Sequence, residues 1–323
     1  MLRLSPLPSL TLTFAAVLSL GLGACNRRSA YNGLSDSALA DRAALYENEA
    51  AQFRKVGETP NLQAPESAHY DSDLDVWFVS NINGNPTAKD NNGFISRIAP
   101  NGKVYSIKFI EGGKKGVTLN APKGMAVVGD TLWVADLDAV RVFNKRTGTP
   151  ITSVKVPGAR FLNDAAADPN GAIYVTDTGV IPDPKTGLKH VGPDRVYEVK
   201  GRSATVALES PQLAGPNGIA WAKDEDAFVI VPFFGSSIFA WKPGSKSLRS
   251  IGSGPGQLDG VEPLDDGRLV ISSWADSSLF ILDKGRNTKV ASGIVSPADF
   301  GIHDKIVAVP QLMENRLQLL EMP

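Results

Sequence analysis

Six polar residues stand at equivalent places in a repeated sequence pattern and could converge on one site. Each lies in a short motif that is followed, about a dozen residues later, by an apolar segment. The six are Glu66, Lys123, Asn163, Asn217, Asp259 and Asp299. Oxygen ligands from carboxylates and amides suit one hard divalent cation, Ca²⁺ above all, with Mg²⁺ and Mn²⁺ as other candidates. The alternative is that these residues only line a channel and are held by water.

The spacing of the six residues predicts the scaffold that would bring them together. Successive members are about 40 residues apart, with longer steps after Glu66 and Asn163. A period of this length with several short strands per repeat is typical of propeller blades. We therefore predict an all-β, six-bladed β-propeller of four-stranded antiparallel blades over residues 51–323. The innermost strands of a propeller run along its central channel, so residues that open them should meet at one end of the axis.

The sixth repeat contains only three of the four expected strands, the third ending near Met322. We predict that a segment around Gln52–Glu58 supplies its outer strand, because this pairing would close an otherwise open sheet edge. The longer steps require insertions, which we place at 81–92 and 179–194 and expect over the end of the channel where the six residues lie. Loops on a rigid scaffold commonly bind ligands. His190, in the second insertion, is either an acid–base helper or simply solvated.

Composition and motifs exclude several functions. The formal net charge is -1, which argues against nucleic acid as a partner. The histidines at positions 69, 190 and 303 occupy unrelated blade positions, which argues against a multi-histidine zinc site. Gly112-Gly113-Lys114-Lys115 lacks the spacing of a phosphate-binding P-loop, and no Gly-x-Ser-x-Gly nucleophile elbow is present.

The N-terminal region predicts export and a lipid anchor. Residues 1–24 read as a lipoprotein signal peptide, because an apolar stretch leads into Leu22-Gly23-Ala24 directly before Cys25, the single cysteine. The alternative is an ordinary signal peptide with a chance cysteine. Residues 25–50 would then be a tether, with a short helix from Ser35 or Asp36 to Leu45. This predicts a periplasmic protein of the bacterial envelope held to the membrane through Cys25, and Asn26 favours the outer membrane.

Four of the repeated motifs carry a specific resemblance. They are Pro65-Glu66, Leu162-Asn163-Asp164 with Asp168-Pro-Asn-Gly171, Gly215-Pro-Asn-Gly218 and Leu258-Asp259-Gly260. With these motifs the chain resembles, over about residues 60–320, the family of SMP-30 (regucalcin) and gluconolactonase, and more distantly diisopropylfluorophosphatase and the paraoxonases. The resemblance implies that Glu66, Asn163, Asn217 and Asp259 hold one catalytic divalent ion.

The resemblance also implies a reaction. The metal would polarise the carbonyl of a small-molecule lactone or ester, and Asp259 would be the general base or nucleophile. A purely structural role as ligand is the alternative for Asp259. Two other functions stay open: a non-catalytic propeller that binds a ligand or an envelope protein, and a strictosidine-synthase-like propeller, which would lack this metal set.

Two departures from the family affect the substrate. Phe161 stands where many family lactonases have a substrate-binding arginine, and Arg160 is shifted by one position. Lys123 adds a cation that could bind an anionic substrate group, or could form a structural salt bridge with Asp299 or Glu66. Lys123, Asp299, Phe161 and His190 are therefore the substrate-binding candidates.

Overall fold

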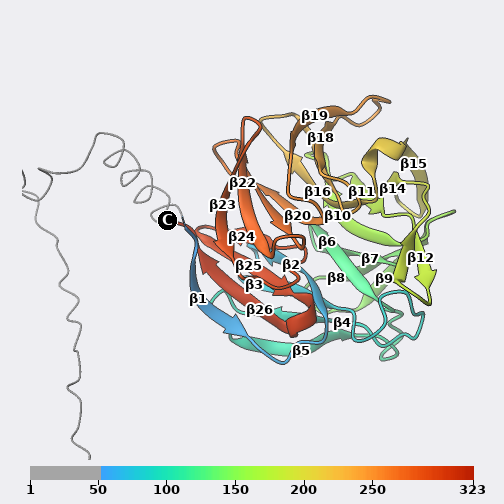
Figure 1. The fold of residues 1–323 in the computed structure, drawn as a ribbon. Coiled ribbons are helices and arrows are strands. Elements are labelled where there is room, and N and C mark those ends of the chain that lie inside the picture. The colour runs from blue at the N-terminus through green and yellow to red at the C-terminus, as the bar shows by residue number, and fades with distance from the viewer. Residues whose placement is uncertain (1–51) are drawn as a thin grey trace, which may run out of the picture. The chain divides into compact units, whose positions relative to one another are not determined.

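Six four-stranded antiparallel sheets follow one another along residues 52–323, the part of the chain that the computed structural model describes (Figure 1). The inner strands of the first five sheets contact one another in turn, and the inner strand of the first sheet also contacts the last sheet. This is the predicted six-bladed β-propeller. The signal peptide, Cys25, and the tether with its helix lie outside the described residues. Within residues 52–323 no helix is long and apolar enough to cross a membrane.

Each blade is a meander from the channel outwards. Blade one comprises β2 (Pro65–Asp71), β3 (Val76–Asn81), β4 (Phe94–Ile98) and β5 (Val104–Glu111). Blade two comprises β6 (Pro122–Val128), β7 (Thr131–Asp136), β8 (Ala139–Asn144) and β9 (Pro150–Lys155). Blade three comprises β10 (Leu162–Ala167), β11 (Ile173–Asp177), β14 (Arg195–Lys200) and β15 (Ser203–Glu209), with a separate hairpin, β12 (Val180–Asp183) and β13 (Gly187–His190), between its second and third strands.

The second half of the ring repeats this arrangement. Blade four comprises β16 (Pro216–Ala222), β17 (Ala227–Pro232), β18 (Ser237–Trp241) and β19 (Arg249–Ser253). Blade five comprises β20 (Leu258–Pro263), β21 (Leu269–Ser273), β22 (Ser278–Asp283) and β23 (Arg286–Ser292). Blade six comprises β24 (Gly301–His303), β25 (Ile306–Gln311), β26 (Arg316–Glu321) and, as its outer strand, β1 (Arg54–Thr59). Two short 3₁₀ helices, η1 (Pro211–Leu213) and η2 (Leu312–Glu314), complete the described elements.

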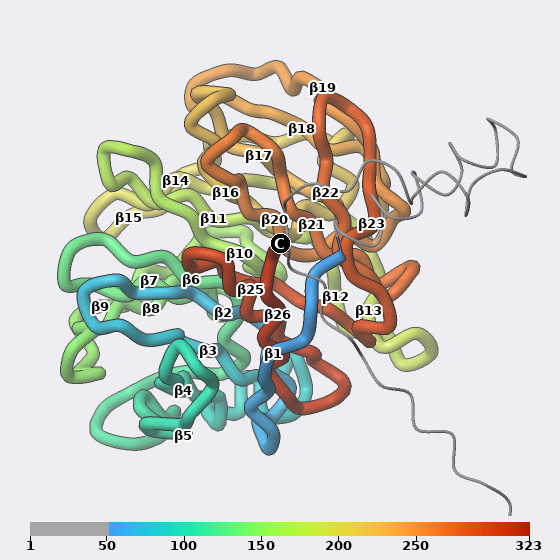
Figure 2. Tube along the Cα trace, turned by 90° about the vertical axis from the view of Figure 1, so that its left-hand side faces the viewer, coloured from blue at the N-terminus to red at the C-terminus, as the bar shows by residue number. Residues whose placement is uncertain are grey.

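The two ends of the propeller are joined by strand pairing. β1 pairs antiparallel with β26, from Arg54 opposite Glu321 to Thr59 opposite Leu317, and Figure 2 shows the two strands side by side. The prediction that a segment ahead of blade one closes blade six is therefore confirmed. The outer edge of β26, which would otherwise be unpaired, is covered.

The cores between blades are built from alternating apolar side chains. On the seam between blades one and six, for example, Trp77, Val79 and Ile98 pack with Ala308, Leu317 and Leu319, all almost completely buried. Period-two alternation presents such side chains to both neighbouring sheets, because each blade is covered on its two faces. The cores hold the inner strands at fixed positions around the axis.

The inner strands of blades one to five share an irregularity that determines where their side chains point. In each of them the pairing with the second strand shifts register just after the first residue, between Pro65 and Ser67, Pro122 and Met125, Leu162 and Ala165, Pro216 and Ile219, and Leu258 and Val261. These bulges contain five of the six repeated polar residues. A bulge leaves the extra residue outside the hydrogen-bonded ladder and redirects its side chain. Equivalent positions of the sequence repeat therefore also share the same backbone geometry.

Glycine follows the polar residue in three of these bulges, and close packing of inner strands explains it. A Cβ on Gly218 would lie 2.3 Å from the backbone oxygen of Asp259, and one on Gly124 would lie 2.0 Å from Oδ1 of Asp164. Any side chain at these positions would push neighbouring inner strands apart. The glycines therefore let the polar residues of adjacent blades approach the axis together.

Candidate functional site

A cavity of about 650 Å³ lies at the mouth of the channel, and five of the six repeated polar residues line it. They are Glu66, Lys123, Asn163, Asn217 and Asp259. All five side chains are buried. Each comes from the bulge of a different inner strand, so the predicted convergence occurs for these five.

The four residues of the expected ligand set share one feature. In each, one buried oxygen has no hydrogen-bond partner within the described residues: Oε2 of Glu66, Oδ1 of Asn163, Oδ1 of Asn217 and Oδ1 of Asp259. A buried polar atom without a partner costs about 1–3 kcal/mol, and four in one cavity call for a ligand. Two carboxylate and two amide oxygens fit a hard divalent cation.

Buried hydroxyl groups orient the Asn163 amide and fix the backbone of Asn217. Asn163 donates from Nδ2 to Oγ1 of Thr178 at 3.0 Å, and this hydroxyl in turn donates to the backbone oxygen of Pro216 at 2.9 Å. Thr176 Oγ1 accepts from the Asp164 backbone N–H at 2.9 Å and donates to the Asn217 backbone oxygen at 2.7 Å. The amide oxygen of Asn163 is thereby left free, and the backbone that carries Asn217 is tied to blade three.

The electrostatics of the two carboxylates also fit a cation. Burial raises the pKa of Glu66 well above its usual range, and the nearby Asp259 raises it further. Burial likewise raises the pKa of Asp259, with Asp299 adding to the rise, while the Trp274 indole and the Asn217 amide oppose it. The chain itself provides too little positive charge to offset two buried carboxylates that lie near each other. A bound cation would supply that charge.

No group of three or more His, Cys, Asp and Glu side chains in residues 52–323 is arranged to hold a metal ion. The four-residue set is not such a group, because half of its ligands are amides. This composition is compatible with Ca²⁺, which accepts amide and backbone carbonyl oxygens beside carboxylates. The nitrogen and sulfur ligands that are usual for zinc are not part of this set.

Lys123 lies in the cavity without a salt bridge. Its Nζ donates to the backbone oxygen of Ala121 at 3.0 Å and, at 3.5 Å, to that of Pro86, and it sits 4.1 Å from the centre of the Phe161 ring. The described residues give it no ion pair with either Asp299 or Glu66. Burial lowers the pKa of Lys123 to about 8, against the opposing effect of Glu66 and Asp136.

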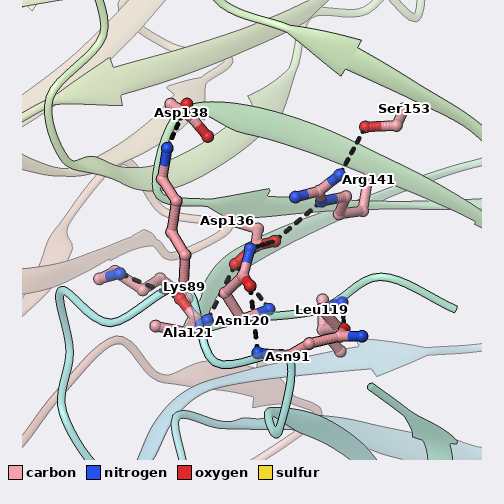
Figure 3. A network of polar contacts seen from close by, with 10 residues as sticks. Lys89, Asn91, Leu119, Asn120, Ala121, Asp136, Asp138, Arg141 and Ser153 are labelled. Atoms are coloured by element: carbon pink, nitrogen blue, oxygen red, sulfur yellow. Dashed lines mark hydrogen bonds and ion pairs between the residues drawn. The ribbon is translucent and has the colours of Figure 1, made fainter. Parts of the chain in front are cut away.

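The acceptors of Lys123 are positioned by a polar network on blade two (Figure 3). Asp136, the last residue of β7, accepts from the backbone N–H groups of Asn120 and Ala121 at 3.0 and 2.9 Å and from Arg141 Nε at 2.8 Å. It therefore fixes the backbone from which the Ala121 carbonyl reaches Lys123.

The same network anchors the first insertion. Asn120 Oδ1 accepts from the Asn91 backbone N–H at 3.2 Å, Asn91 Oδ1 accepts from the Leu119 N–H at 2.8 Å, and Lys89 pairs with Asp138 at 2.7 Å (Figure 3). Gly84 and Pro86 of this insertion line the cavity, as expected for a loop over the channel end.

Phe161 lines the cavity, whereas Arg160 is exposed and does not. Asp177 accepts hydrogen bonds from the backbone N–H groups of both residues, at 2.9 Å from Phe161 and 3.1 Å from Arg160. This fixes the chain so that the ring points inwards. The shift of the arginine by one position therefore removes its guanidinium from the cavity.

His190 is not part of the cavity lining. Its Nε2 lies 2.6 Å from Oδ1 of Asp194, and its ring stacks on that of Phe234 with centroids 4.7 Å apart. Other residues of the second insertion, Val180 and Thr186 to Leu188, do line the cavity. The insertion thus covers the predicted end of the channel, and His190 supports Phe234 on the rim.

Asp299 lies apart from the cavity, in a second one of about 210 Å³ deeper along the inner strands, together with His69, Asp164 and Glu262. Its Oδ2 accepts a hydrogen bond from Ser67 Oγ at 2.6 Å, and its backbone N–H donates to the Glu66 carbonyl at 3.0 Å. Blade six also shifts register, between the Pro297–Gln311 pair and the Gly301–Ala308 pair, and Ala298 stands where Glu66 stands in blade one. Asp299 lies one residue further, opposite Ser67, and therefore joins the first and last inner strands and holds Glu66 instead of lining the mouth.

The cavity wall was not apparent from the repeat. Phe233, Phe234, Trp274, Leu312 and Met313 line it, yet they come from connections that differ between blades. The only sequence signal is the aromatic pair after β17, and nothing in the spacing placed it near the axis.

A six-bladed propeller with an oxygen-lined cavity on its axis defines the class of this protein. Residues 66–242 match the SMP-30/Gluconolactonase/LRE-like region, and the chain belongs to this family. This confirms the resemblance drawn from the repeated motifs.

Two solved structures share the fold. A gluconolactonase from Xanthomonas campestris is 17% identical, with a TM-score of 0.62 over 87% of this chain and 93% of that one. A catalytically inactive virginiamycin B lyase from Staphylococcus aureus, solved with quinupristin, is 13% identical, with a TM-score of 0.58 over 84% and 99% of the two chains. At these identities the likeness concerns the fold. Comparison with curated proteins gives no match.

The Thr176 hydroxyl provides a first prediction. In Thr176→Val the Asp164 N–H and the Asn217 carbonyl lose their buried partner, so unfolding should require about 1–3 kcal/mol less. Chemical denaturation with chelator present measures this. Thr205→Val, on the exposed face of β15, is the matched control and should change stability by no more than about 0.5 kcal/mol. Equal effects of the two substitutions would contradict the bridging role of Thr176.

The second cavity provides a pH prediction. Burial, followed by the charge of Asp299, raises the pKa of Glu262 to about 8. Because the folded state holds this proton more tightly, the contribution of Glu262 to stability is complete below its unfolded pKa and is lost as pH rises towards 8. Glu262→Gln should therefore be more stable than wild type at pH 8, by about 1 kcal/mol or more, and closer to it at pH 5. Denaturation curves at the two pH values test this, and a difference independent of pH would refute it.

Proposed function

We propose that this protein is a divalent-metal-dependent hydrolase of the lactonase or esterase type. The observation that carries the proposal is the set of four unpartnered, buried oxygens from Glu66, Asn163, Asn217 and Asp259 in one cavity. Family membership supports it, and one solved structure with the same fold is that of a gluconolactonase. Ca²⁺ is the proposed ion, and these four side chains would hold it.

A bound divalent cation would polarise the carbonyl group of a lactone or ester. Asp259 accepts the proton of the attacking water as general base, since it is a carboxylate inside the cavity and beside Trp274. The water oxygen bonds to the acyl carbon, the acyl carbon–oxygen bond breaks, and the departing oxygen takes up a proton. The product is a hydroxy acid, or an acid and an alcohol.

Lys123 would stabilise negative charge on the reacting carbonyl or on the product acid. It is the only cationic side chain among the cavity-lining residues of the described chain. The charges of Glu66 and Asp259 balance those of a divalent ion, so the Lys123 ammonium leaves the cavity with an excess of positive charge. In many acyl-transfer reactions, the largest contribution to transition-state stabilisation comes from charged or polar groups already positioned where negative charge develops.

One alternative remains open: the same cavity could bind a ligand without turning it over. Phe161 at the position of the family's arginine favours it, because this propeller then lacks one substrate-binding group of its relatives. The metal-binding and turnover measurements below separate the two.

We also propose that the protein lies in the bacterial envelope, on the periplasmic side, anchored through acyl chains on Cys25. The support is the sequence alone: an apolar stretch and small residues precede the single cysteine. Cys25→Ser should move the protein from the membrane fraction to the soluble fraction of lysed cells, while Ser29→Ala should leave it membrane-bound. Mass spectrometry of the mature N-terminus would show acyl chains on Cys25, and their absence would contradict the anchor.

Metal binding is the direct test. Titration of Ca²⁺ into chelator-treated protein should show one site, and stability should rise by about 2.7 kcal/mol when free Ca²⁺ is about 100-fold above its dissociation constant. Asp259→Asn should weaken binding and lower lactone turnover by roughly 10²- to 10⁴-fold. Asp265→Asn, exposed on a turn of the same blade, is the control. Absence of divalent-metal binding would refute the proposal, and metal binding without turnover would favour the binding function.

A further inference from the structure

We propose that the site takes lactones or esters that carry an apolar substituent, in preference to polyhydroxylated sugar lactones. This inference rests on the proposed function and specifies its substrate class. It is argued from the wall, the rim and the polar groups of the cavity.

The wall of the cavity is mainly apolar. Beyond the four oxygen ligands and Lys123 it is formed by Phe161, Val180, Leu188, Phe233, Trp274 and Leu312, among others. Phe233 meets Trp274 edge-on, with ring centroids 5.7 Å apart. Such a wall favours the burial of apolar groups and, apart from the Trp274 indole N–H, offers few hydrogen-bond partners to a hydroxyl group.

The hydroxyl groups on the wall are already occupied by the protein, whereas the Trp274 indole N–H is a buried donor without a hydrogen-bond partner in the described residues. Thr178 Oγ1 accepts from Asn163 and donates to Pro216 O, and Thr186 Oγ1 donates to Leu188 O at 2.9 Å. Asn315 Oδ1 accepts from the Ala64 backbone N–H at 2.7 Å. A sugar lactone would bring several hydroxyl groups that lose their water and find few free partners here, which costs affinity.

The rim extends the apolar wall into solvent. Phe234 and Met313, both lining the cavity, are 44% and 67% exposed. Phe234 is held by the stacked ring of His190 and by Phe233 at a centroid distance of 5.3 Å. Large apolar side chains left exposed at the mouth of a site are typical of surfaces that a ligand covers. An alkyl or aryl group projecting from a ring at the metal would cover them.

The size of the cavity agrees with such a ligand. Its volume of about 650 Å³ lies in the range of sites that enclose drug-sized ligands. A bare lactone ring at the four oxygens would leave most of this space to water against apolar walls. A substituent would fill it.

Three δ-lactones with the same six-membered ring test the inference on calcium-loaded wild-type protein. They are δ-valerolactone without a substituent, δ-decalactone with an alkyl chain, and glucono-δ-lactone with hydroxyl groups. We expect kcat/KM for δ-decalactone to exceed that for δ-valerolactone by about tenfold or more, because each buried methylene contributes a few-fold. Glucono-δ-lactone should be the poorest substrate. Equal or better turnover of glucono-δ-lactone would overturn the inference while leaving the hydrolase function intact.

A rim variant adds a second test. The double substitution Phe234→Ser and Met313→Ser should lower kcat/KM for δ-decalactone severalfold more than for δ-valerolactone. Val206 lies on β15, away from these loops in the sequence, and is 47% exposed. As the control, Val206→Ser should leave the ratio of the two kcat/KM values unchanged. An unchanged ratio in the double variant would contradict the rim's part in the inference.

Binding separates failure of the inference from failure of the function. Calorimetric titration and tryptophan fluorescence, to which Trp274 in the wall contributes, measure δ-decalactone and glucono-δ-lactone binding without turnover. If no lactone is hydrolysed but δ-decalactone binds at least tenfold more tightly, the hydrolase function fails and the apolar preference stands. If neither lactone binds, or the glucono-lactone binds more tightly, the inference is overturned.

Discussion

The geometry of the site depends on buried hydroxyl groups near the ends of the second strands. Ser80, Thr176 and Ser272 accept a hydrogen bond from a backbone N–H within the bulged part of the inner strand beside them. Thr176 and Ser272 also donate to a backbone carbonyl on the next blade. In blades three and five one hydroxyl thus replaces the ladder bond that the bulge removes and joins two blades. Without it, the bulge would leave an unsatisfied buried amide, and the axis would lose its fixed spacing.

Burial of two carboxylates near each other is the unfavourable consequence of this arrangement. Glu66 and Asp259 are held where their charges repel and where little water reaches them. The fold tolerates this because the cost is confined to one cavity and the blade cores supply the stability. A divalent cation bound between the two carboxylates would attract both of them and offset their mutual repulsion. The scaffold thus holds the four oxygens in place before any ligand binds.

Much of the architecture could be predicted because each copy of the sequence repeat corresponds to one blade. The period gave the blades, and equivalent positions gave the polar residues of blades one to five, since their shared bulge directs them alike. Asp299 was grouped with them on the same evidence, but in blade six Ala298 occupies the equivalent bulge position, and Asp299, one residue further along, lies deeper. The acceptors of Lys123 could not be foreseen, because Pro86 belongs to an insertion without a counterpart in other blades. The apolar wall escaped prediction for the same reason: Phe233 and Met313 lie in non-repeating connections.

The pairing of β1 with β26 has a consequence for how the molecule is made. β1 is the earliest described strand to leave the ribosome, and its partner is the last. The interface between them therefore cannot form until β26 has been made, and until then the blades in between form an open arc with an uncovered edge at each end. Contacts between residues so far apart in sequence form slowly. The ring of blades therefore closes only after β26 has been made. A chain cut short before β26 would lack a closed channel for the site.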